Sequence, residues 1–334
     1  DITGAISTET NGTGSLTLAG GTQSVTGQIG TSTVLLASVS SGVANGDVST
    51  FDGDVYATTV SVGAGETSFN DAVGATTVSI GAGTANFNVD GGSTTAAIEF
   101  TGAGVANLNE GLAGTIDFDG NNAVVNLADN KTITGLITDT TATPFNGTVN
   151  VEANGTLSGG VSGIAALNLN TEDPQSASDT AARVTRVNAN VSATNVVLSD
   201  GATLQVANDV DITGDITAAL SGGDDGYTDN ILELLGSSDV TGNVGTAASP
   251  LDEIQAGVDG SSSLFAGGVV YSDLLNYQNG GGEVTFNGSG ASGSLGFVGV
   301  VDFDPASSAD LDGLSDVVGS GNPAAKLSLG NSVD

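Results

Sequence analysis

The sequence predicts an all-β fold, a right-handed parallel β-helix (β-solenoid) with turns of about 18–21 residues. Three observations predict it: a unit repeated four times between Val55 and Lys131, two apolar columns in step with it, and a glycine-rich corner between them. The first column advances by 18, 20 and 18 residues through Val60/Val62, Val78/Ile80, Ile98/Phe100 and Ile116/Phe118. The second column runs through Phe69, Phe87, Leu108 and Leu127.

Each unit contains two short stretches in which apolar residues alternate with Thr, Ser or Asn. An alternation of period two places the apolar side chains on one face of a strand. Small residues separate the two stretches, as at Gly63–Gly65 and Gly81–Gly83, and predict a tight corner. Coiling then closes the core without a second layer, and parallel connections of this kind favour the right-handed sense.

The repeat is blurred over residues 1–50 and looser after Lys131. Polar stretches near 171–182 and 221–230 interrupt it and predict loop insertions, since strands rarely carry such residues. We therefore expect one β-solenoid over residues 1–304, followed by an irregular acidic C-terminal segment over 305–334.

Composition excludes several classes of function. The chain has 38 acidic and 4 basic residues, a formal charge of −34, which repels nucleic acid and anionic membranes. It has no Cys and no His, so it lacks disulfides, zinc-thiolate sites and the commonest general base. No apolar run approaches the roughly 20 residues of a membrane helix, so we expect no membrane insertion. Divalent cations or high salt would screen this charge, and we expect an extracellular or cell-surface location.

Two acidic stretches are candidate calcium sites. One places carboxylates beside glycines that allow tight turns, and the other has Asp-x-Asp-Gly-x-x-Asp spacing. Calcium takes six to eight oxygen ligands from such mixed sources. The alternatives are an ordinary solvated turn and a charged terminal segment. The candidate metal ligands are Asp224, Asp225, Asp229, Asp310, Asp312 and Asp316.

Polar residues recur beside the second strand of each unit. Stacked in successive turns, Asn amides can hydrogen-bond to one another and serve a turn. The alternative is an acidic stripe that binds divalent ions. The pairs are Asn70/Asp71, Asn88/Asp90, Asn109/Glu110 and Asn126/Asp129.

Two short phrases resemble a known family. They are Gly-Thr-Ile-Asp-Phe at 114–118 and the run from Val240 to Thr246 that leads into Pro250-Leu251. They resemble the passenger regions of bacterial autotransporter surface antigens, especially the rickettsial type. The resemblance implies a right-handed β-helix exposed on a bacterial surface and serving adhesion or coat formation.

These observations lead us to expect a secreted or cell-surface structural or adhesive protein rather than an enzyme. Its partner would be a host or neighbouring cell surface. One alternative is a self-assembling subunit of an extracellular filament or surface layer, formed by end-to-end strand stacking. Another is a carbohydrate-active β-helix enzyme that uses paired carboxylates.

Overall fold

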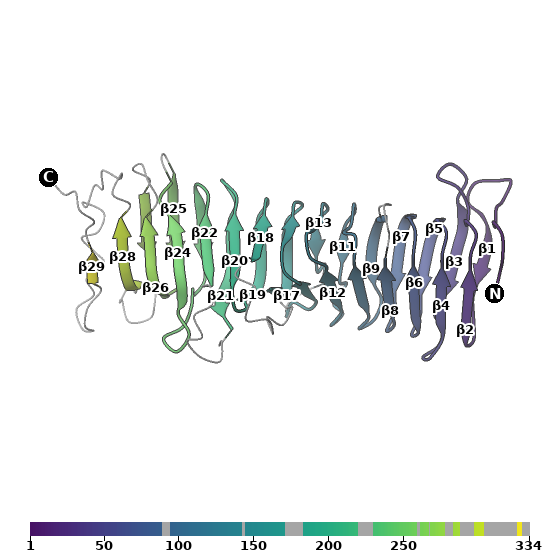
Figure 1. Cartoon of the computed structure of the whole chain (residues 1–334), viewed down its shortest axis with the longest axis horizontal. Helices are drawn as coiled ribbons and strands as arrows, with labels where there is room; N and C mark the ends of the chain where they lie inside the picture. Colours follow the sequence, from purple (N-terminus) through teal and green to yellow (C-terminus); the bar gives the residue numbers. More distant parts are fainter. Residues whose placement is uncertain are drawn as a thin grey trace. The chain divides into compact units, whose positions relative to one another are not determined.

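The computed structural model describes residues 1–88, 94–141, 144–170, 183–219, 230–258, 261–266, 268–277, 283–287, 297–303 and 326–328. In these ranges the secondary structure consists of strands and turns. They contain no helix long and apolar enough to cross a membrane. The chain divides into two compact units, Asp1–Ala165 and Ala166–Asp334, and in each the strands stack in parallel as a β-solenoid (Figure 1).

In the first unit each turn contributes one strand to each of two main columns. The first column contains β1 (Thr13–Thr17), β3 (Leu36–Ser41), β5 (Val55–Val62), β7 (Val73–Ile80), β9 (Thr94–Phe100), β11 (Ile116–Asp117), β14 (Ile137–Thr138) and the start of β17 (Val161–Leu169). The second contains β2 (Thr22–Val25), β4 (Val48–Phe51), β6 (Glu66–Phe69), β8 (Thr84–Phe87), β10 (Val105–Leu108), β12 (Val124–Leu127) and β15 (Thr148–Val151). A short third column pairs β13 (Lys131–Ile133) with β16 (Gly155–Leu157).

The register confirms the columns that the sequence predicts. Val60 lies opposite Val78, Val78 opposite Ile98, and Ile98 opposite Ile116. The second apolar column is paired in the same way, through Phe69, Phe87, Leu108 and Leu127. The parallel solenoid is therefore confirmed. Its right-handed sense stays a prediction, made from the strong preference of parallel strand connections for that sense.

Aromatic ladders fill the core of the first unit. Phe51, Phe69 and Phe87 are fully buried, and consecutive rings stack with centroids 5.3 Å apart. Phe100 and Phe118 form a second stack at 5.4 Å. Identical residues at the same place in successive turns thus bury one ring directly on another, which adds a specific pair interaction to the hydrophobic burial.

The second unit continues the same architecture with other strands. One column contains β18 (Arg183–Val187), β20 (Ala202–Val206), β22 (Ile231–Leu234), β24 (Leu251–Ala256), β26 (Val270–Tyr277), β28 (Phe297–Phe303) and β29 (Lys326–Ser328). The other contains the end of β17, β19 (Val191–Leu198), β21 (Ile212–Ala218), β23 (Ser238–Thr241), β25 (Ser262–Ala266) and β27 (Glu283–Asn287).

The length of a turn varies along the chain. Hydrogen-bonded partners on successive turns are 18 residues apart at Asp52 and Asn70, but 28 apart at Gln205 and Glu233. The long step contains the loop insertion predicted near 221–230. Both insertions fall largely outside the described residues, as does most of the predicted C-terminal segment, where β29 pairs with β28.

Candidate functional site

The six predicted metal ligands lie outside the described residues. Asp224, Asp225 and Asp229 fall within 220–229, and the other three within 304–325. In the ranges that are described, no three His, Cys, Asp or Glu side chains come together to hold a metal ion. Calcium binding by Asp224, Asp225, Asp229, Asp310, Asp312 and Asp316 therefore stays a prediction.

The clearest surface feature of the first unit is a ladder of partly exposed asparagine amides on the outer face of the second column. Each Nδ2 donates to the Oδ1 of the Asn one turn before it, at 2.6 Å from Asn107 to Asn86, 2.7 Å from Asn126 to Asn107 and 2.8 Å from Asn150 to Asn126. The series ends where Asn86 donates to Glu66 Oε1 at 2.9 Å. All the amide dipoles therefore point the same way, and such chains of hydrogen bonds strengthen one another.

A second ladder runs beside the first. Asn109 donates to Asn88, Asn88 to Asn70, and Asn70 to the Asp52 carboxylate at 2.9 Å. The stacked amides predicted at Asn70, Asn88 and Asn109 are confirmed. The prediction that Asn126 belongs to the same column is wrong, because Asn126 precedes Leu127 and so pairs with Asn107 and Asn150.

Several carboxylates in the first unit accept hydrogen bonds from backbone amides. Asp47 accepts from the N–H groups of Gly20, Gly21 and Ala44, and these bonds, from Ala44 first, lower the pKa of Asp47. Burial alone would raise the pKa of Asp139, but hydrogen bonds from Asn146, Thr141 and Gly120 hold it below its usual value. Hydrogen bonds from backbone N–H groups favour the charged form of a carboxyl group. Each of these two carboxylates therefore holds together the loops whose N–H groups it accepts from.

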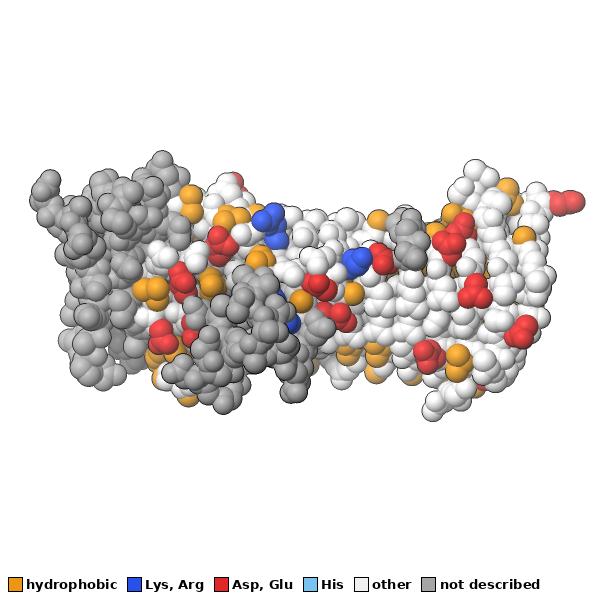
Figure 2. All heavy atoms as spheres, in the orientation of Figure 1, with side chains coloured by type: hydrophobic (Ala, Val, Ile, Leu, Met, Phe, Trp, Pro, Cys, Tyr) orange, Lys and Arg blue, Asp and Glu red, His pale blue; other side chains and the backbone are white. Residues whose placement is uncertain are grey.

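Basic side chains also bond to side chains on neighbouring turns. Lys131 pairs with Glu110 one turn before it, at 2.7 Å. In the second unit Arg186 Nε donates to Gln205 at 2.5 Å, and Gln205 donates to Glu233 at 2.6 Å. Acids and bases that the strands bring to one column are therefore linked by direct or amide-mediated bonds. Figure 2 shows acidic side chains scattered over the visible face among uncharged ones.

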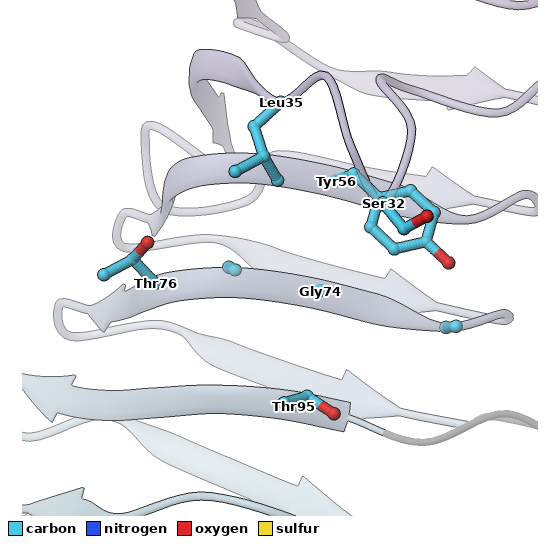
Figure 3. A pocket seen from close by; sticks show the side chains of 8 residues that line it. Ser32, Leu35, Tyr56, Gly74, Thr76 and Thr95 are labelled. Atoms are coloured by element: carbon cyan, nitrogen blue, oxygen red, sulfur yellow. The ribbon is translucent and has the colours of Figure 1, made fainter. Parts of the chain in front are cut away.

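A shallow hollow of about 390 Å³ opens on the outer face of β5, β7 and β9 (Figure 3). The Tyr56 ring covers Gly74 one turn later, where a Cβ would lie 2.6 Å from Tyr56 Cδ1. Burial, and then the charges of Asp54 and Asp71, raise the pKa of Tyr56 and keep its hydroxyl neutral. The lining has no charged residue and suits an uncharged ligand; it consists of Ser32, Leu35, Tyr56, Ala72, Gly74, Ala75, Thr76 and Thr95.

Sequence reasoning did not identify this hollow. The signal that could have found it is the spacing of Tyr56 and Gly74, which places an aromatic residue and a glycine opposite each other on adjacent strands. A glycine in a strand marks a place where another group approaches closely.

The parallel β-solenoid is the kind of fold that the resemblance to autotransporter passengers implied. No protein-family model, curated protein or solved structure matches the chain.

Proposed function

We propose that this chain is a structural or adhesive β-solenoid of a secreted or cell-surface protein, of the autotransporter-passenger kind. Its partner is a host or neighbouring cell surface. The observation that carries the proposal is the pair of asparagine ladders, which repeat one arrangement of amide groups on successive turns.

A repeating polar surface favours attachment by many weak contacts. Successive turns of a solenoid are about 4.8 Å apart, so each ladder offers donors and acceptors at a regular interval. Many weak contacts on one rigid body act together, because the second and later contacts form at high effective concentration. Uncharged amides are also compatible with partners that a charge of −34 would otherwise repel.

Retention of protein-coated beads on cells tests the proposal. We expect beads carrying the full chain to stay on bacterial or animal cells under flow longer than beads carrying an unrelated acidic protein of similar charge. A chain with Asn86, Asn107 and Asn126 replaced by Ser should lose part of this retention while keeping its circular dichroism spectrum. Equal retention of the full chain and the acidic control on every cell type would refute an adhesive role.

The same preparation tests the two alternatives. Light scattering and negative-stain imaging across a concentration series would reveal end-to-end assembly as particles that lengthen with concentration. Incubation with uronate and neutral glycans would reveal a carbohydrate-active enzyme by product release. Either result without cell retention would replace the adhesive proposal.

A further inference from the structure

Three polar residues occupy one cross-strand column in the second unit. Ile231 lies opposite Glu253, so Asn230, immediately before β22, lies opposite Asp252 on β24. Leu251 lies opposite Ser272 and Glu253 opposite Leu274, so Asp252 lies opposite Asp273 on β26. The Asp252 side chain also contacts Asn230 directly, because Asp252 Oδ2 accepts a hydrogen bond from the Asn230 backbone N–H at 2.7 Å.

Asn230 is the unusual member of the column. The residue is only 5% exposed, and its Oδ1 atom is buried without a hydrogen-bond partner among the described residues. A buried carbonyl oxygen that has left water and found no donor destabilises the fold, so most buried polar atoms are paired. The oxygen therefore needs a donor or a cation that the described part of the chain does not supply.

The two acids add a second unfavourable feature. Asp252 and Asp273 are both carboxylic acids, and they lie on adjacent strands, which are about 4.8 Å apart. Asp273 is exposed and Asp252 is partly exposed, so an ion can reach both carboxylates from solvent. A bound cation would remove the repulsion between the carboxylates and supply the missing partner of Asn230 Oδ1 at the same time.

We propose that Asn230 Oδ1 and the carboxylates of Asp252 and Asp273 bind a calcium ion. Oxygen ligands of mixed amide and carboxylate type suit Ca²⁺, and water completes its shell of six to eight oxygens. With only two carboxylates the affinity is in the range of extracellular calcium modules, about 10⁻⁴–10⁻³ M. The site differs from the six acidic residues that the sequence suggested, and it does not depend on the adhesive role.

Thermal unfolding of the full chain in CaCl₂ and in EDTA, at constant ionic strength, tests the site. We expect millimolar calcium to raise the melting midpoint of wild type by about 2–5 °C, because only the folded state binds the ion. Asp273→Asn should lose most of this rise. Asp209→Asn is the matched control: it removes the same charge at φ 60°, a conformation that Asn tolerates, and should keep the full rise.

Asn230→Leu separates calcium binding from simple relief of a buried polar group. We expect this variant to melt at or above the wild-type midpoint in EDTA, because an unpaired buried oxygen is gone, and to gain little from calcium. Titration calorimetry should show the matching loss of calcium affinity in both variants. The proposal is overturned if wild type does not respond to calcium, or if Asn230→Leu and Asp273→Asn keep the whole wild-type response.

Discussion

Replacement of Gly83 by Ala tests how tightly successive turns pack at the glycine corners. The corner backbones of adjacent turns are so close that a Cβ on Gly83 would lie 2.1 Å from Gly65 O and 2.8 Å from Gly63 O. Both contacts are with backbone, so no flexible side chain can move away. Gly65 O accepts from the Thr84 N–H and Gly63 O from the Gly83 N–H, each at 2.9 Å.

To relieve these contacts the corner must open by roughly an ångström, which lengthens both of these hydrogen bonds beyond their normal range. We expect Gly83→Ala to lower the free energy of unfolding by about 3–5 kcal/mol, since overpacking costs about 1–3 kcal/mol and each lost hydrogen bond about 1 kcal/mol. Gly83 does not adopt a left-handed φ, so backbone strain adds nothing to this loss.

Urea unfolding followed by circular dichroism measures the effect. Gly81→Ala is a graded control, because its Cβ would lie 2.9 Å from Gly63 O. Gly46→Ala controls for backbone strain alone, since Gly46 has φ 87° and open space around it, and should cost about 1–2 kcal/mol. If Gly83→Ala loses no more stability than Gly46→Ala, close contact between turns does not explain the corner glycines.

Three other changes test the surface and the core. The pKa of Asp54 is raised by burial and then by Asp71, so the stability that its protonated form contributes is lost as pH rises through the raised pKa. Asp71→Asn should therefore raise the melting midpoint at pH 7 and leave it near wild type at pH 3; an effect at both pH values would contradict this. Asn107→Asp removes an amide donor and places a carboxylate against a carbonyl oxygen, and should cost about 1–3 kcal/mol in urea unfolding. Phe69→Ala removes the middle ring of a stack and should cost about 3–5 kcal/mol, whereas a loss below about 1 kcal/mol would show that the ladder repacks.

The core columns could be predicted because they depend on a simple pattern. Where Val60, Val78 and Ile98 recur at nearly constant spacing, only one register buries all three side chains, and a shift of one residue would turn them outward. Phe51 was not part of the predicted column, although it stacks on Phe69 one turn later. The repeat is less regular there, and pairing across turns is what reveals its place.

The surface sites were less predictable. Asn126 was assigned to the wrong ladder because it lies one residue before Leu127, whereas Asn88 lies one residue after Phe87, its partner in the apolar column. The calcium column of Asn230, Asp252 and Asp273 has no motif in the sequence, since its members are separated by whole turns of unequal length. Only pairing between turns brings them together.

The sequence by itself determined the fold class, the apolar columns and the glycine corners. These follow from period-two alternation and a repeat of near-constant length, which are local properties of the chain. The tertiary structure decided which polar residues become neighbours, how the asparagine ladders are directed, and which buried oxygens of the described residues lack a partner. The physical reason is that each of these depends on the register between turns, and the number of residues in a turn changes along the chain.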